Sequence, residues 1–239
     1  MYETNYHRAS SIDDAVAQFG KGTEAKFLAG GQTLLPVMKQ RLAAPSDVID
    51  VAKIKDMVGI EISGDTVTIK GATTHYDVAQ SDAVQKAIPA LAHLASMIGD
   101  PAVRYRGTIG GSLAAEDFFK GLFSTALEDG EIITAVTFPV PAKAGYAKMR
   151  HPASRFALTG VFVVKTKAGD IRVAATGASQ SGVVRVPAIE QALKANWSAS
   201  ALDSVTISAS GLLADIHGSS DYRANLVKVM GQRAVTAAG

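Results

Sequence analysis

A glycine-interrupted stretch near the N-terminus constrains the fold more than any other feature. Residues 26–29 are mostly apolar and end on a small side chain, which predicts a short buried strand. Gly30 and Gly31 follow at once, and adjacent glycines can take positive φ and let another group approach the backbone closely. Thr33 can cap a helix that tolerates Pro36 in its first turn. A strand, a tight turn and a helix N-terminus suit an anionic ligand such as a phosphate, although a simple strand-to-helix turn is the alternative.

The residues around this turn predict a small parallel unit. Tyr6 marks an edge strand, Ser11 can cap a helix with two acids in its first turn, and residues 47–51 read as a third strand. A helix over residues 34–42 lies between the second and third strands. Strands that alternate with helices favour a parallel sheet with helices packed on it.

Farther along the chain, residues 60–62 and 66–70 alternate around a turn and predict a hairpin. Thr74 can cap a helix in which His75 is expected to be a solvated first-turn residue rather than a ligand. A longer helix is expected from about residue 83 to residue 97, and a strand over residues 131–138.

Pro139 and Pro141 mark the best domain boundary in the sequence. After it, residues 145–150, 157–166 and 171–177 read as three strands, the last two forming a hairpin. Helices are expected over residues 188–195 and 219–237, the second with an apolar stripe and interspersed basic residues.

A second glycine loop has the same character as the first. Residues 107–111 hold three glycines, Thr108 and Ser112 supply hydroxyls, and Arg104 and Arg106 come just before. Neither loop contains an obvious acid, base or nucleophile. Backbone N–H donors, hydroxyls and close access predict the binding of a cofactor rather than the breaking of a bond by protein side chains.

Composition removes several classes of function. The chain has no cysteine, which excludes disulfides, thiolate zinc sites and an iron–sulfur cluster carried by this chain. A net charge of +2 gives no indication of nucleic-acid binding. No apolar run approaches the roughly 18 residues of a membrane span, and the N-terminus lacks the apolar core of a signal peptide, so a cytoplasmic protein is expected.

The two glycine loops carry a family resemblance. The sequences AGGQTLLPVMKQRLA (residues 29–43) and RGTIGGSLA (residues 106–114) closely resemble the FAD-binding loops of the medium subunit of molybdenum hydroxylases, in the carbon monoxide dehydrogenase and xanthine dehydrogenase family. Residues 71–74, residues 148–160 and the last basic helix extend the resemblance over nearly the whole chain. Paired motifs in this order are far more specific than a single glycine pattern.

The resemblance implies an α+β architecture. A PCMH-type FAD-binding fold would occupy residues 1–139, with a small β-α-β subdomain at about 1–52 and a larger mixed-sheet subdomain at 53–139. A C-terminal domain over residues 140–239 would hold a three-stranded antiparallel sheet with helices.

The family also implies a function and partners. This chain would carry FAD, take electrons from the [2Fe–2S] clusters of a small subunit and pass them to an external acceptor. A large subunit would hold the molybdopterin cofactor and oxidise the substrate. The expected assembly is a heterotrimer, doubled into a dimer of heterotrimers. Neither the substrate nor the final electron acceptor can be deduced from this chain.

Site residues follow by motif from the same resemblance. The residues expected to wrap the pyrophosphate and ribityl region of FAD are Leu28, Ala29, Gly30, Gly31, Gln32, Thr33, Leu34 and Leu35 in the first loop, and Thr108, Ile109, Gly110, Gly111 and Ser112 in the second. No catalytic residue and no metal ligand is expected on this chain.

Three further positions match residues near the flavin ring. Ile98 and Ile133 match positions that pack beside the flavin, and core packing is the alternative for both. Lys148 matches a lysine near the isoalloxazine ring, where a cation would stabilise the reduced cofactor by Coulomb attraction; a solvated strand lysine is the alternative.

One departure from the family pattern follows Ala114. The family has a segment of a few tens of residues here, including an aspartate that binds ribityl or ribose hydroxyls, whereas Ala115 follows at once in this chain. Asp117 belongs to a later motif and is not assigned that role. Either the deletion is real, or the natural protein has a segment that this sequence lacks. The second is favoured because a deletion would leave buried backbone groups unpaired.

Two other functions remain open. The chain could be a stand-alone flavin oxidoreductase of the same cofactor fold, but residues 140–239 show no acid–base set for a substrate. It could also be a structural subunit that has lost its flavin.

Overall fold

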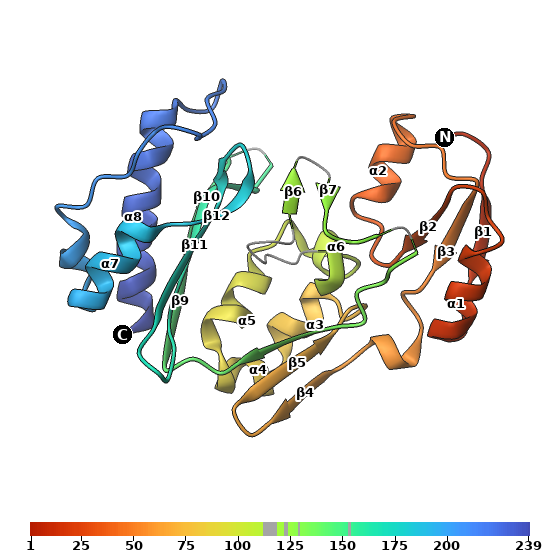
Figure 1. The fold of residues 1–239 in the computed structure, drawn as a ribbon, viewed down its shortest axis with the longest axis horizontal. Helices are drawn as coiled ribbons and strands as arrows, with labels where there is room; N and C mark the ends of the chain where they lie inside the picture. The colour runs from red at the N-terminus through yellow and green to blue at the C-terminus, as the bar shows by residue number, and fades with distance from the viewer. Residues whose placement is uncertain (112–118, 122–123, 129, 153) are drawn as a thin grey trace. The chain divides into compact units, whose positions relative to one another are not determined.

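The computed structural model describes residues 1–111, 119–121, 124–128, 130–152 and 154–239 (Figure 1). Ser112 and the Ala114–Ala115 junction therefore lie outside the described residues. Backbone contacts divide the chain into two compact units. The first unit comprises Met1–Gln80, Asp100–Leu113 and Leu127–Pro139, and the second comprises Ser81–Gly99, Ala114–Ala126 and Val140–Gly239.

The small parallel sheet expected at the N-terminus forms in the first unit. Its strand order is β1-β3-β2, with both pairings parallel. The elements are β1 (Asn5–Arg8), α1 (Ile12–Phe19), β2 (Ala25–Leu28), α2 (Leu34–Lys39) and β3 (Asp47–Asp50). Ser11 caps α1 by accepting a hydrogen bond from the Asp14 amide, as predicted. Thr33 precedes α2 but makes no capping hydrogen bond, because its own backbone is already helical (φ −109°, ψ −54°).

A continuous apolar core supports this sheet. Ile49, Val51, Ile54 and Met57 are each almost fully buried. Because β3 is the central strand, its side chains meet residues from both neighbours and from α1. This core fixes the carboxyl end of β2, where the first glycine loop begins.

A second, antiparallel sheet completes the first unit. It has the order β4-β5-β8 and is built from β4 (Ile60–Ser63), β5 (Thr66–Lys70) and β8 (Ala135–Pro139). The other elements of the unit are η1 (Lys55–Met57), α3 (His75–Gln80), α6 (Pro101–Arg104) and η2 (Ile109–Gly111). The predicted hairpin and the Thr74 cap of α3 are confirmed. The strand expected from residue 131 starts only at Ala135.

The second unit contains a four-stranded antiparallel sheet of order β12-β11-β10-β9. Its strands are β9 (Lys143–Arg150), β10 (Ala157–Lys165), β11 (Ile171–Ser179) and β12 (Gly182–Arg185). The three strands expected from the sequence are present, and β12 adds a fourth edge strand. A short pair, β6 (Phe119–Gly121) and β7 (Ser124–Thr125), also belongs to this unit.

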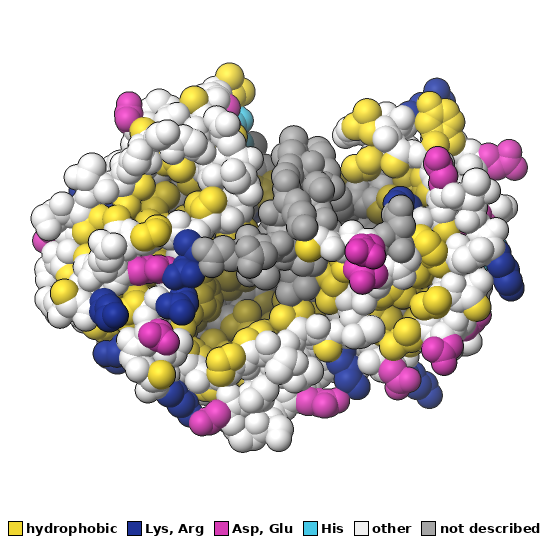
Figure 2. Space-filling model, in the orientation of Figure 1, with side chains coloured by type: hydrophobic (Ala, Val, Ile, Leu, Met, Phe, Trp, Pro, Cys, Tyr) yellow, Lys and Arg dark blue, Asp and Glu magenta, His cyan; other side chains and the backbone are white. Residues whose placement is uncertain are grey.

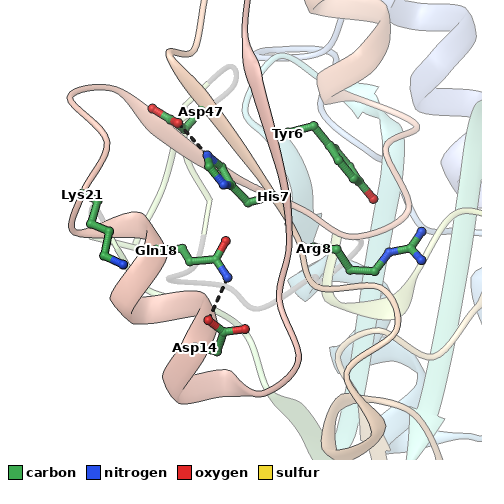
Figure 3. A pocket seen from close by; sticks show the side chains of 7 residues that line it. All are labelled: Tyr6, His7, Arg8, Asp14, Gln18, Lys21 and Asp47. Carbon is green, nitrogen blue, oxygen red and sulfur yellow. Dashed lines mark hydrogen bonds and ion pairs between the residues drawn. The ribbon is translucent and has the colours of Figure 1, made fainter.

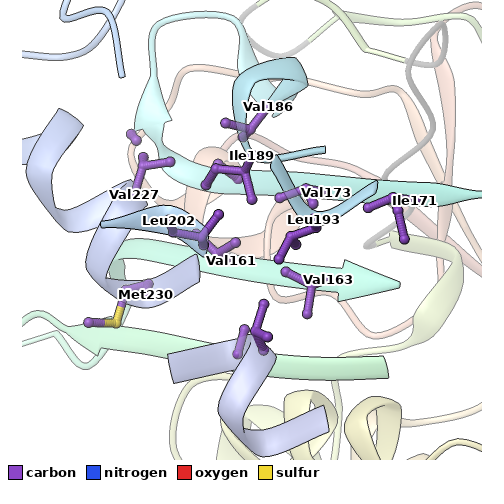
Figure 4. Packing of buried hydrophobic residues seen from close by; sticks show 14 residues of the cluster. Val161, Val163, Ile171, Val173, Val186, Ile189, Leu193, Leu202, Val227 and Met230 are labelled. Carbon is purple, nitrogen blue, oxygen red and sulfur yellow. The ribbon is translucent and has the colours of Figure 1, made fainter. Parts of the chain in front are cut away.

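Helices complete the second unit. They are α4 (Asp82–Ala87), α5 (Pro89–Ser96), α7 (Pro187–Ala195), η3 (Ala199–Leu202) and α8 (Ser220–Ala238). Of these, α5, α7 and α8 contact the strands of the sheet. The single helix expected over residues 83–97 is two helices, because Ile88 precedes a proline and takes φ −142° and ψ 77°. Figure 4 shows the core, in which Val161, Val163 and Val173 meet residues of α7 and α8.

Strand β9 has two different faces. Ala147 and Met149 pack against the core that includes α8, whereas Tyr146 contacts the ring of His93 in α5. Gly145 belongs to the first face, and a Cβ there would overlap the carbonyl oxygen of Ala234. Because strand side chains alternate, Lys148 lies on the same face as Tyr146.

Candidate functional site

The first glycine loop lies directly against the chain that leads into the second. A Cβ added at Gly30 would lie 2.7 Å from the Gly107 Cα and would overlap the Arg106 carbonyl oxygen. Real Cβ atoms essentially never approach another atom so closely. Gly30 therefore allows two backbone segments, separated by more than seventy residues in the sequence, to touch.

Gly31 has a different role, because its φ of 71° lies in the left-handed region that favours glycine. This conformation turns the chain out of β2 and into α2. The Leu35 amide donates to Gly31 O (3.2 Å), and the Val37 amide donates to Thr33 O (3.2 Å). Among the described residues, the amides of Gln32, Thr33 and Leu34 have no such acceptor, so the loop offers several backbone donors.

The second loop is held by backbone hydrogen bonds to residues 71–74. The Ile109 amide donates to Thr73 O (3.0 Å) and the Gly110 amide donates to Gly71 O (2.9 Å). A Cβ at Gly110 would lie 2.7 Å from the same Gly71 oxygen. The motif at residues 71–74 is therefore the platform on which the second glycine loop rests.

Ile133 joins this platform through its backbone. A Cβ at Gly71 would overlap the Ile133 carbonyl oxygen, and the Gly71 amide donates to Thr134 O (2.7 Å). This bond lies just beyond the Lys70–Ala135 end of the β5–β8 ladder. The structure thus brings both glycine loops, residues 71–74 and Ile133 together in the first unit.

His75 supports the second loop from inside, which corrects the expectation of a solvated side chain. The residue is only 2% exposed, and its amide donates to Gly107 O (2.9 Å). Burial disfavours the charged imidazole and lowers the pKa of His75 to about 4. Sequence reasoning missed this because a cap at Thr74 places the helix start but does not show which face of the helix is covered.

Lys148 and Ile98 belong to the second unit, where Lys148 contacts Met97, the residue before Ile98. The Lys148 Nζ donates to the backbone oxygen of Met97 (2.6 Å), and the Arg150 Nη2 lies 3.0 Å from the Met97 Sδ. Lys148 is partly buried, so the alternative of a freely solvated strand lysine is wrong. The link between β9 and the turn at Met97 was not foreseen in the sequence.

Tyr146 is a further residue of this face that the sequence analysis did not select. It is buried, and its desolvation raises the pKa of the phenol to about 12, so the ring stays neutral. Its spacing of two residues from Lys148 on a predicted strand was a signal that could have identified it.

The chemistry of these groups favours binding over catalysis. No carboxylate occurs among residues 28–35 or 108–111, so an anion would meet backbone donors without repulsion from the loops. Within the described part of the chain, no group of three or more metal-ligating side chains is present.

The structure also contains a cavity of about 520 Å³ in the first unit, beside α1 and β1 (Figure 3). None of the predicted site residues lines it. Its polar groups are largely paired with one another: His7 bonds Asp47 (2.7 Å) and Gln18 bonds Asp14 (2.7 Å). The cavity is therefore not the predicted site.

No helix among the described residues is long and apolar enough to cross a membrane.

The family model described as the FAD binding domain in molybdopterin dehydrogenase matches residues 2–116 of the chain.

Known proteins resemble the chain over almost its full length. The carbon monoxide dehydrogenase medium chain of Hydrogenophaga pseudoflava is 32% identical, covering 98% of this chain and 96% of its own. The nicotine 6-hydroxylase medium subunit of Paenarthrobacter nicotinovorans is 33% identical, with the same coverage. In the solved structure of reconstituted CO dehydrogenase from Oligotropha carboxidovorans, one chain matches with a TM-score of 0.87 and 30% identity, covering 99% of this chain and 97% of that one.

The alignment with the first of these relatives spans 275 positions, more than the 239 residues of this chain. The relative therefore has some tens of residues without a counterpart here. Three observations agree on the family of this chain: the near-complete coverage of the chain and its relatives, the matching FAD-binding domain, and the contact between the two glycine loops. This chain belongs to the family of FAD-binding medium subunits of molybdenum-containing hydroxylases, which includes the medium chain of carbon monoxide dehydrogenase.

Proposed function

We propose that the chain binds FAD noncovalently through its two glycine loops and serves as the electron-transfer subunit of a molybdenum hydroxylase. The observation that carries this proposal is the backbone contact at Gly30, which places the two family motifs side by side. Neither motif alone would enclose a dinucleotide. Their juxtaposition creates one continuous surface of glycines and backbone donors.

The residues present fit the pyrophosphate of FAD. Gly31 takes a left-handed φ of 71°, where a Cβ would also crowd the side chains of Leu28 (3.1 Å) and Leu35 (3.0 Å). The amides at residues 32–34 have no backbone acceptor among the described residues. Backbone donors of this kind bind phosphate oxygens. The proposed ligands are residues 28–35 and 108–112, of which Ser112 lies outside the described residues.

The flavin ring would be contacted by Ile98, Ile133 and Lys148. Bound FAD would supply the chemistry by accepting electrons from a partner's iron–sulfur clusters and releasing them to an external acceptor. Lys148 would contribute a positive charge whose position is fixed by its bond to Met97 O. A fixed cation favours the more negative, reduced form of a nearby group.

The proposed partners are a large subunit with the molybdopterin cofactor and a small subunit with two [2Fe–2S] clusters, assembled as a dimer of heterotrimers in the cytoplasm. The names of the two relatives described above support this proposal, since one is called a medium chain and the other a medium subunit. The absence of cysteine supports it as well, because iron–sulfur clusters require ligands that this chain lacks.

The visible spectrum of the native complex, purified through a tag on this chain, tests the proposal. Flavin absorbance, FAD in the heat-released supernatant, and two further chains that carry molybdenum and iron are expected. Gly31→Val and Gly110→Val should each strip the flavin from a folded chain. Gly64→Val is the matched control, since Gly64 also has positive φ (53°) but no atom within 4 Å of its Cβ position.

Other outcomes identify the alternatives. Full flavin occupancy in both loop variants would show that the loops are not the FAD site. Turnover of a substrate by the isolated chain with a quinone or a nicotinamide would identify a stand-alone oxidoreductase. A colourless chain within an intact complex would identify a structural subunit.

A further inference from the structure

We propose that His75 is a positioning residue of the FAD site: its buried ring keeps Gly107 in contact with Gly30, and the two glycine loops retain the cofactor only while that ring stays neutral. This inference rests on the proposed function and extends it. It assigns a role in cofactor retention to a side chain that lies outside both glycine motifs.

Gly107 is in close contact with both the first glycine loop and the His75 ring. A Cβ added at Gly30 would lie 2.7 Å from the Gly107 Cα. A Cβ added at Gly107 would lie 3.1 Å from the His75 Cδ2 and 3.5 Å from the His75 Nε2. The His75 amide also donates to Gly107 O (2.9 Å). A displacement of the ring therefore reaches the contact between the two loops through a single residue.

The residues on either side of His75 contact the same segment. Thr74 forms an antiparallel bridge with Thr108. The Tyr76 ring stacks on the Tyr105 ring, with centroids 3.9 Å apart. Three successive residues at the start of α3 thus contact the chain that leads into the second loop. Because these contacts are continuous, a movement of His75 shifts the loop and is not absorbed by slack in the chain.

Burial keeps the His75 ring neutral. The residue is only 2% exposed, and burial is the sole cause that lowers the pKa of the imidazole to about 4. Among the described residues, the titratable groups on the segments in contact with His75 are Tyr76, Asp77, Arg104, Tyr105 and Arg106. None of them offsets burial by stabilising the imidazolium. Figure 2 shows acidic and basic side chains interspersed on one face of the molecule, which agrees with burial, rather than a field of one sign, as the cause.

Protonation of His75 favours separation of the second loop from α3. A charged ring is costly to bury, so the imidazolium is more stable where residues 105–108 have moved away and water reaches it. In that open conformation the ring has the ordinary histidine pKa of about 6.5. With a pKa of about 4 in the closed conformation, the ratio of open to closed chains rises about 20-fold from pH 7 to pH 5.

The test measures how fast FAD leaves the native complex, purified through a tag on this chain. The complex is diluted into flavin-free buffer at pH 7, pH 6 and pH 5, and release is followed by flavin fluorescence calibrated with free FAD at each pH. The rate constant of the wild type should rise about 20-fold from pH 7 to pH 5, because opening precedes release. Circular dichroism at each pH shows whether the chain stays folded.

Two substitutions separate the shape of the ring from its charge. His75→Phe keeps a ring that cannot be protonated, so release should be independent of pH; His75→Gln, also uncharged, replaces it if the phenylalanine variant does not fold. His75→Ala removes the ring and should speed release at pH 7 about tenfold. His7→Gln is the matched control, because His7 is the other histidine of the first unit and pairs with Asp47 (2.7 Å). It should keep the pH dependence of the wild type.

Each result has a definite meaning. A wild-type rate that does not change with pH, or an equal rise in the wild type and the uncharged variant, overturns the inference while FAD binding by the loops stands. Release from His75→Ala at the wild-type rate overturns it too, because the ring then positions nothing. The same holds if FAD leaves only as the circular dichroism signal is lost, since unfolding then frees it. A wild-type complex without flavin refutes the proposed function itself.

Discussion

Replacing Gly30 with alanine tests whether contact between the two loops is required for cofactor binding. The new Cβ would lie 2.7 Å from the Gly107 Cα, whereas ordinary Cβ contacts begin near 3.4 Å. The Arg106 carbonyl oxygen lies closer still, so the two segments must separate by about an ångström. The second cannot recoil freely, because the Gly107 amide donates to Val103 O (2.7 Å) and Gly107 O accepts from His75.

Overpacking of this kind typically costs about 1–3 kcal/mol. If that cost falls on the geometry of the FAD site, the dissociation constant for FAD rises by about 5- to 150-fold. The assay is titration of flavin-depleted protein with FAD, followed by flavin fluorescence or by calorimetry. Gly20→Ala is the control, since its Cβ would meet nothing closer than 3.7 Å. Unchanged FAD affinity in folded Gly30→Ala would refute the argument that loop contact builds the site.

Three other substitutions test separate parts of the structure. Arg223→Met should lower the free energy of unfolding by about 3 kcal/mol, because it leaves the Leu158 and Gly177 carbonyls without their buried donor. Urea denaturation measures this change, and a loss below about 1 kcal/mol would contradict the expected role of Arg223. The pKa of His75 is lower in the folded state (about 4) than in the unfolded chain (about 6.5), so the free energy of unfolding should fall by about 2 kcal/mol from pH 7 to pH 5. His75→Phe should remove this contribution to the pH dependence. If the wild type and the variant lose stability in parallel as the pH falls, the burial of a neutral His75 is not its cause. Lys148→Met should lower the reduction potential of the bound flavin, measured by spectroelectrochemistry, and an unchanged potential would exclude a role near the ring.

The elements that sequence reasoning predicted well are those with local signals. Ser11 and Thr74 cap their helices, and the hairpin at β4–β5 forms where alternation and a turn coincide. Gly31 takes the positive φ that a pair of glycines allows. In each case the determinant lies within a few residues of the chain, so no tertiary information was needed.

Tertiary contacts decided the rest. Only glycine fits at position 30, because the Arg106 backbone lies against it, and the spacing of residues in the sequence does not reveal this contact. Arg223 was read as one basic residue of a helix, yet it is only 3% exposed and bonds two strand carbonyls. His75 is buried because the second loop covers it. The assignment of individual FAD ligands came from the family resemblance and stays a prediction, as does the domain boundary near Pro139.

The lack of a side chain at Gly145 has a mechanical consequence. With the backbone of α8 pressed onto this point of β9, the strand cannot slide along the helix without a collision of main-chain atoms. Lys148 lies three residues farther along the same strand, so its distance along β9 from that fixed point is set by the strand rise alone, about 10 Å. One inserted residue between Gly145 and Lys148 would turn the lysine into the core and expose an alanine in its place. The contact of α8 with one face of β9 thus fixes where the Lys148 charge lies on the other face of the strand.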